Sequence, residues 1–428
     1  MGVIDKIKGY IAKDIVKVFS LNAVGTLVKM VSNFISVKVI AYTVGPSGVA
    51  LLGQLQNFVQ LALGYSNGGI HNGITKYVAE YKNDETKLKP ILSCSLKLTL
   101  FFTTLSSIIM IVFHDYLSSL IMQSNEYGYL FIIFGVTIFM YTLNLLLISI
   151  LNGFKEFRKY VIINIAGSVF SLILIVSLVF ICGIHGALIG AVTYQSLSFI
   201  VTLLLCRRLY WLKRSFLNQK VDFITIKKFL RFSAMSLVSV SLVPICQMVL
   251  RGYVISNISA VEAGWWEGTN RISGMYLMII TTSFSVYYLP RLSEIYDPKE
   301  LKSEIIKCYQ FLVPLLLGIL LLTYFFRVLI IRILFSEEFL PMENLFIWQL
   351  CGDFFKVISW VLAYLMLAKA MTRRFILTEV VFTILLTLLS FLFLSFNGVI
   401  GLTQGYCITY IVYSIVMFLL FKNILLVK

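Results

Sequence analysis

The chain has 428 residues, of which 59% are hydrophobic and only 13% are charged. A soluble protein of this length has about a quarter of its residues charged, so the composition excludes a water-soluble globular protein and indicates a surface that faces hydrocarbon. The net charge of +16 does not indicate nucleic acid as a partner, because the basic residues stand singly or in pairs at the ends of apolar runs, as the positive-inside rule requires.

Apolar runs of membrane-spanning length recur along the whole chain. A helix needs about 20 apolar residues to cross a bilayer. On this basis we predict an all-α membrane protein with about twelve spans, at 18–42, 50–75, 90–113, 127–151, 160–182, 186–206, 229–252, 261–289, 304–325, 342–369, 374–396 and 399–421. The longest polar stretch predicts an N-terminal six-helix lobe at 1–206, a basic cytoplasmic linker at 207–228 and a C-terminal six-helix lobe at 229–428.

The connections between the spans alternate in charge. Most of the 36 lysines and arginines fall on the side that includes both chain ends and the linker, while the opposite side has only Arg251, Arg327 and Arg332. The positive-inside rule therefore predicts that both termini and the linker are cytoplasmic.

Motifs of several catalytic classes are missing from the sequence. No GxxxxGK[ST] or HExxH pattern occurs, and the seven cysteines and three histidines lack metal-ligand spacing. We therefore expect no metal and no other cofactor. A membrane enzyme of glycan assembly would need catalytic groups gathered in a sizeable loop, and these connections are too short, so the sequence favours transport over catalysis.

Charged and amide side chains within the first two spans are candidates for function, because a charge costs roughly 2.5–3.5 kcal/mol at mid-span and usually faces an internal cavity. Lys29 has no acidic partner in its own helix and is the strongest candidate for an anion ligand. Lys38 either faces the cavity or snorkels to the interface. Gln54 and Asn57 either contact a sugar or bond helix to helix. His71, in a glycine-broken stretch, is either a packed polar residue or a proton carrier.

The eighth span has Glu267 and Arg271 four residues apart, where they either neutralise each other or face the cavity. Arg251 closes the seventh span, where we expect it at the interface or on the rim of a cavity.

A polar stripe on the tenth span includes Asp353, Lys356 and Trp360, and Glu379 follows in the eleventh. Asp353 and Lys356 either form a structural pair or divide their duties, with Lys356 holding phosphate and Asp353 serving the coupling ion. Cations together with amide and aromatic groups suit a ligand that is both anionic and sugary.

Three segments resemble a known family: 69–81 (GIHNGITKYVAEY), 283–293 (SFSVYYLPRLS) and 345–356 (LFIWQLCGDFFK). They are similar to the Wzx-type O-antigen flippases, and most similar to the lipid III (enterobacterial common antigen) flippases. The resemblance implies the multidrug/oligosaccharidyl-lipid/polysaccharide exporter superfamily, with two six-helix lobes around a cationic central cavity.

The resemblance also implies a function. It predicts a flippase in the bacterial inner membrane that moves an undecaprenyl-pyrophosphate-linked oligosaccharide, of O-antigen or common antigen, from the cytoplasmic to the periplasmic leaflet by ion-coupled alternating access. The implied partners are this lipid-linked glycan, membrane lipid, and the polymerase and chain-length regulator of the same pathway. The substrate candidates are Lys29, Lys38, Gln54, Asn57, Arg251, Arg271, Lys356 and Trp360, and the ion-coupling candidates are Asp353, Glu267, Glu379 and His71.

Not every candidate lies in a matching segment. Arg271 lies where its surroundings depart from the lipid III flippases, which leaves its role and the glycan open. An alternative with the same fold is a drug or cation antiporter of the related multidrug exporter family. Such a carrier would need an embedded acidic pair without excess cations, whereas this sequence has Lys29, Arg271 and Lys356.

The predicted topology can be tested by single-cysteine labelling in a cysteine-free background. Cysteines placed in the linker should resist an impermeant reagent in intact spheroplasts and react once the membrane is permeabilised, because positive-inside loops stay in the cytoplasm. Labelling of linker positions in intact spheroplasts would invert the topology.

Overall fold

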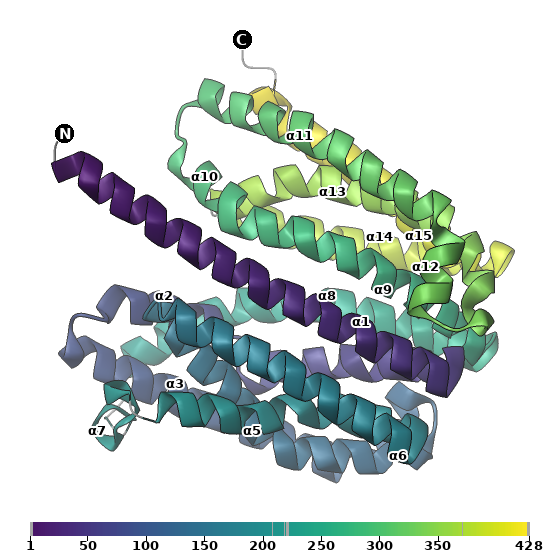
Figure 1. The fold of residues 1–428 in the computed structure, drawn as a ribbon, viewed down its shortest axis with the longest axis horizontal. Helices are drawn as coiled ribbons and strands as arrows, with labels where there is room; N and C mark the ends of the chain where they lie inside the picture. Colours follow the sequence, from purple (N-terminus) through teal and green to yellow (C-terminus); the bar gives the residue numbers. More distant parts are fainter. Residues whose placement is uncertain (1–2, 208, 218, 220–221, 370, 426–428) are drawn as a thin grey trace. The chain divides into compact units, whose positions relative to one another are not determined.

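The computed structural model describes residues 3–207, 209–217, 219, 222–369 and 371–425, and this part of the chain contains helices and no strand (Figure 1). The helices are α1 Val3–Ser66, α2 His71–Tyr81, α3 Glu85–Val112, α4 His114–Leu117, α5 Gly128–Gly153, α6 Phe157–Cys206, α7 Arg214–Leu217, α8 Phe223–Asn257, α9 Ala260–Ser283, α10 Leu289–Glu294, α11 Pro298–Phe325, α12 Arg327–Leu334, α13 Phe346–Ala368, α14 Thr372–Asn397 and α15 Ile400–Leu425.

Nine helices in the described part of the chain are long and apolar enough to cross a membrane. Two of these, α1 and α6, are each bent at a glycine and so provide two arms. Helix α9 has membrane-spanning length but a lower apolar content, because it carries Glu267, Asn270 and Arg271. With α9 and the second arms of α1 and α6, the described residues provide twelve membrane-length arms. The protein is an all-α, multi-pass membrane protein, as the sequence predicts.

The two bent helices turn at Gly45 (φ 65°) and Gly183 (φ 54°), in the left-handed region that glycine adopts without steric cost. Pro46 follows directly and begins the second arm of α1, where its missing N–H leaves no helical hydrogen bond unmade. These corners replace the short external connections expected near 43–49 and 182–186.

The chain forms two compact units. Unit 1 comprises Met1–Thr43 and Leu55–Ser241, and unit 2 comprises Val44–Gln54 and Leu242–Lys428. The units differ from the predicted lobes in two places, because the corner of α1 belongs to unit 2 and the first part of α8 belongs to unit 1. A functional division of six helices and six at the linker stays a prediction.

Part of the predicted linker is folded into unit 1. Trp211 and Phe216 are buried in an apolar core with residues of α2, α3 and α5. Next to them, the Gln219 N–H donates to Ser93 Oγ at 3.0 Å and Lys97 Nζ donates to the Gln219 carbonyl at 2.8 Å. The linker's residues 208, 218 and 220–221 lie outside the described part of the chain.

In unit 2 the corner segment 44–54 packs against the start of α9. A Cβ on Gly264 would overlap the backbone carbonyl of Pro46, and a Cβ on Gly53 would lie 2.5 Å from the carboxyl carbon of Glu267. The two glycines therefore permit a backbone approach that larger residues would block. Farther along unit 2, α13 contacts α11, α14 and α15 (Figure 1), and this packing positions the polar groups described next.

Candidate functional site

The described part of unit 2 contains two clusters of charged side chains within its apolar helices. The first, the arginine–glutamate cluster, consists of Arg251 on α8 with Glu267 and Arg271 on α9. The second, the aspartate–lysine site, consists of Asp353 and Lys356 on α13, Glu379 on α14 and the hydroxyl and aromatic groups around them.

In the arginine–glutamate cluster, one carboxylate serves two guanidinium groups. Glu267 Oε2 lies 2.5 Å from Arg251 Nη2, and Glu267 Oε1 lies 2.9 Å from Arg271 Nε. Arg251 is fully buried, with its guanidinium 5.3 Å from the ring centroid of Trp266. Two cations share one anion, so the cluster has a formal net charge of +1. Arg271 is half-buried and has the more accessible of the two guanidinium groups.

The burial of Arg251 shows that its guanidinium does not reach water at the end of the span. A guanidinium at the end of a span normally reaches water, but this one is neutralised inside the unit and also donates to Gln247 Oε1 at 3.2 Å. Gln54, which belongs to the corner segment of α1, donates to the Met248 carbonyl at 2.9 Å and accepts from Arg251 at 3.5 Å. The sequence allowed Gln54 either to contact a sugar or to bond one helix to another, and the hydrogen bonds in the structure are of the second kind.

In the aspartate–lysine site, Asp353 is fully buried and accepts hydrogen bonds from three hydroxyl groups. Ser273 and Tyr406 donate at 2.6 Å each, and Tyr276 donates to the same oxygen as Ser273. Hydrogen bonds to a carboxylate are stronger than those between neutral groups, so these donors replace much of the lost hydration.

Lys356 is half-buried, and its ammonium contacts aromatic faces. Its Nζ lies 5.4, 5.2 and 5.0 Å from the ring centroids of Trp360, Tyr406 and Tyr410. No ion pair within 4.0 Å joins Lys356 to Asp353 or Glu379 in the described part of the chain. The two charges of this helix turn therefore have separate partners, and Tyr406 connects them: its hydroxyl binds Asp353 and its ring faces Lys356.

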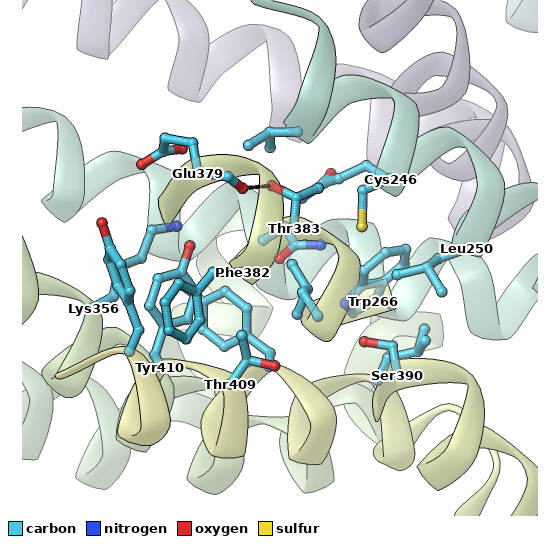
Figure 2. A pocket seen from close by; sticks show the side chains of 17 residues that line it. Cys246, Leu250, Trp266, Lys356, Glu379, Phe382, Thr383, Ser390, Thr409 and Tyr410 are labelled. Atoms are coloured by element: carbon cyan, nitrogen blue, oxygen red, sulfur yellow. Dashed lines mark hydrogen bonds between the residues drawn. The ribbon is translucent and has the colours of Figure 1, made fainter. Parts of the chain in front are cut away.

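A cavity of about 70 Å³ lies beside this site, between α8, α9, α13, α14 and α15 (Figure 2). Lys356 and Glu379 both line it, together with Tyr406 and Tyr410. Three buried polar atoms in its wall have no hydrogen-bond partner in the described part of the chain: Asn270 Nδ2, Ser390 Oγ and Tyr413 Oη. Such atoms are ordinarily satisfied by buried water, and the cavity has the polarity and space to hold it.

The remaining candidates lie in unit 1. Lys29 is exposed on the first arm of α1, and Lys38 and Asn57 are half-buried on the same helix. His71 begins α2 directly after the break at Gly68 and Gly69, whose positive φ angles end α1. No group of three or more metal-ligating side chains occurs in the part of the chain that the structure describes.

Sequence reasoning found Trp360 but missed the serine and tyrosine partners. Tyr406, Tyr410 and Tyr413 recur at the spacing that places residues on one helix face, directly after the glycine-rich start of α15. That repeat was a detectable signal. Ser273 and Tyr276 carried no such signal, because single serines and tyrosines are ordinary in membrane helices.

A family model described as "Polysaccharide biosynthesis protein" matches residues 15–296. The chain belongs to this family. Over 391 residues it is 29% identical to the Lipid III flippases of Escherichia coli (strain K12) and Shigella flexneri, covering 91% of this chain and 94% of each relative. The family membership agrees with the resemblance found in the sequence.

Solved structures of similar fold include an inward-facing multidrug resistance MATE family transporter of the MOP superfamily. The match to that structure has a TM-score of 0.76 at 15% identity, and it covers 92% of this chain and 94% of the transporter. A MOP superfamily transporter from Pyrococcus furiosus has a TM-score of 0.71 at 17% identity, covering 96% and 94%. At these identities the likeness shows the fold alone, and it agrees with the predicted superfamily architecture for this polysaccharide biosynthesis protein.

The shared role of Tyr406 leads to a stability prediction. Tyr406→Phe removes one of three donors to the buried Asp353 carboxylate, which should cost roughly 1–3 kcal/mol and lower the melting temperature of the detergent-purified protein by about 1–3 °C. Tyr296→Phe is the control, because this side chain is 88% exposed and the change removes only a solvent-facing hydroxyl, so it should leave the melting temperature unchanged. Equal melting temperatures for the two variants would contradict the assigned hydrogen bond.

Proposed function

We propose that this protein is a flippase that moves an undecaprenyl-pyrophosphate-linked oligosaccharide from the cytoplasmic to the periplasmic leaflet of the bacterial inner membrane. The observation that carries the proposal is the similarity to the Lipid III flippases along 91% of the chain. Membership of the polysaccharide biosynthesis family supports the same substrate class. The proposal includes no bond-making or bond-breaking step, so the protein acts as a transporter.

The basic side chains of both units support an anionic substrate. In unit 1, Lys29 is exposed and Lys38 is half-buried on α1, and in unit 2 Arg271 is half-buried at the edge of the arginine–glutamate cluster. Pyrophosphate is bound by lysine as a point charge and by arginine through its planar fork. We propose Lys29 and Lys38 within unit 1, and separately Arg271 within unit 2, as candidate ligands for the anionic groups of the substrate. Arg251 has the supporting role of holding Glu267, which in turn orients Arg271.

The relatives' name also bears on the glycan, and we propose a common-antigen type of repeat unit in preference to O-antigen. In the proposed pathway a polymerase and a chain-length regulator act on the flipped product. We further propose that both termini are cytoplasmic, as the distribution of basic residues indicates.

Ion coupling is assigned to the aspartate–lysine site. Glu267 is already committed to two arginines, whereas Asp353 and Glu379 form no ion pair within 4.0 Å in the described part of the chain. A buried carboxylate with separable partners can have two arrangements, which alternating access requires. His71 stays a secondary candidate in unit 1.

The function is tested with purified protein in proteoliposomes that contain a fluorescent undecaprenyl-pyrophosphate-linked glycan. Wild-type protein should move the lipid between leaflets, and Lys29→Ala should slow flipping about tenfold or more, because a charge-assisted contact to phosphate is lost. Lys29→Arg should retain more activity than Lys29→Ala, since it keeps the charge. The control is Lys422→Ala, which removes an exposed lysine near the end of α15 and should flip normally.

Two outcomes of this assay would count against the proposal in different ways. Wild-type flipping with a fully active Lys29→Ala variant would remove Lys29 from the binding site and leave the function standing. Absence of flipping by folded wild-type protein, with transport of a cationic drug in the same vesicles, would favour the antiporter alternative.

The division of duties between Asp353 and Lys356 gives a second prediction for the same assay. Because no ion pair joins them, Asp353→Asn combined with Lys356→Gln should be at least as inactive as either single variant. A neutralising pair would behave in the opposite way, since removing one partner leaves a lone charge in hydrocarbon. Recovery of flipping in the double variant, at matched protein level, would overturn the assignment.

A further inference from the structure

The aromatic rings of the aspartate–lysine site have the arrangement of a binding site for an organic cation. In this protein the ammonium group of Lys356 occupies that binding site. Three rings, from Trp360 on α13 and from Tyr406 and Tyr410 on α15, lie within 5.4 Å of Lys356 Nζ. Aromatic cages of this kind recognise ligand ammonium groups in other proteins. Here the four-carbon side chain of Lys356 brings its own ammonium into the cage, so the ligand is covalently attached.

The cavity beside the cage has the features of a small hydrated chamber. Among the residues that line it, Glu379 is the only acid and Lys356 the only base. The unpartnered atoms Asn270 Nδ2, Ser390 Oγ and Tyr413 Oη are buried in its wall and are ordinarily satisfied by water. The ammonium thus borders a polar space in which a proton can be exchanged.

The same arrangement disfavours a metal cation. Hard cations require several free oxygen ligands, but the Asp353 oxygens are occupied by three hydroxyl groups whose hydrogens point at the carboxylate. The remaining carboxylate, Glu379, shares the chamber with a resident ammonium that repels a second positive charge at short range.

We infer that Lys356 is a tethered cation that permanently fills the aromatic cage of unit 2, so that transport is coupled to protons and does not require Na⁺. The coupling part of this inference rests on the proposed flippase function, whereas the occupied cation site does not. When the ammonium discharges, one N–H bond breaks, the proton passes to water or to the Glu379 carboxylate, and the neutral amine stays attached to α13. The reverse transfer recharges it.

The titratable groups around the site come from several helices. Asp353 lies on the same helix as Lys356, while Glu379 of α14, Tyr406, Tyr410 and Tyr413 of α15 and Cys246 of α8 line the same cavity, and Tyr276 of α9 binds Asp353. The two carboxylates are the acids among them, and both favour the charged amine. A proton that leaves Lys356 therefore passes to Glu379, which lines the same chamber, because the Asp353 carboxylate already accepts three hydroxyl hydrogen bonds.

The occupied cation site is tested by chemical rescue of binding. Lys356→Ala empties the cage and leaves its rings in place, so ethylammonium chloride should raise the melting temperature of the detergent-purified variant by about 2–4 °C at saturation. NaCl and KCl at the same ionic strength should give no such rise, and wild-type protein should not respond to the amine.

Lys369→Ala is the matched control, because Lys369 also contacts an aromatic face but has no enclosing cage. Its Nζ lies 4.9 Å from the ring centroid of Tyr296 alone, and Tyr296 is 88% exposed. This variant should show no response to ethylammonium. A folded Lys356→Ala protein that is unaffected by ethylammonium, or stabilised equally by Na⁺, would overturn the inference.

The coupling is tested on wild-type protein in proteoliposomes, so it does not depend on the folding of a variant. A pH gradient should drive the fluorescent lipid-linked glycan to one leaflet, and replacing all Na⁺ by K⁺ should change the rate by less than about twofold. A Na⁺ gradient that drives transport at uniform pH would overturn proton coupling. Absence of flipping under every gradient would instead count against the proposed function, and ethylammonium binding would then decide the tethered-cation inference alone.

Discussion

The dominant constraint on this molecule is the cost of placing charge in hydrocarbon, several kcal/mol for each unpaired ion. Unit 2 meets it by three different means. Glu267 binds two guanidinium groups directly, Asp353 is surrounded by hydroxyl donors, and Lys356 lies among aromatic faces. The helices that supply these partners must be closely packed, so the positions of α8, α9, α13, α14 and α15 follow from the charges they enclose.

The three arrangements differ in how readily they can change. An arginine held by a carboxylate at 2.5 Å and by stacking on Trp266 is fixed in place, because losing either contact would leave an ion unpaired. A lysine among tyrosine rings is held by weaker, less directional forces and can shift along the ring faces. Unit 2 thus has a rigid charge cluster in the region that contacts the corner of α1, and an adaptable one beside an internal cavity.

Much of the fold could be predicted from sequence, because apolar runs of about 20 residues have few alternatives to membrane helices. The predicted spans leave short breaks at 43–49 and 183–185, and the structure has its corners there, at Gly45 and Gly183. The candidate functional site was harder to predict from the sequence. Glu267, Asp353 and Lys356 were recognisable as charges in apolar surroundings, but their partners were tyrosines, serines and an arginine at a helix end. Which of several polar side chains meets a given charge depends on contacts between helices far apart in sequence, such as α9 with α13, and one sequence does not reveal these.

The corner segment 44–54 has a consequence for biosynthesis. Its contacts in unit 2 include Met248, Gly264 and Glu267, residues that the ribosome adds about two hundred positions later. At roughly 5–20 residues per second, the nascent corner waits on the order of ten to forty seconds before its partners exist. During that interval the amide of Gln54 lacks its native partners in α8, so the corner takes its final packing only after α8 and the start of α9 have been made.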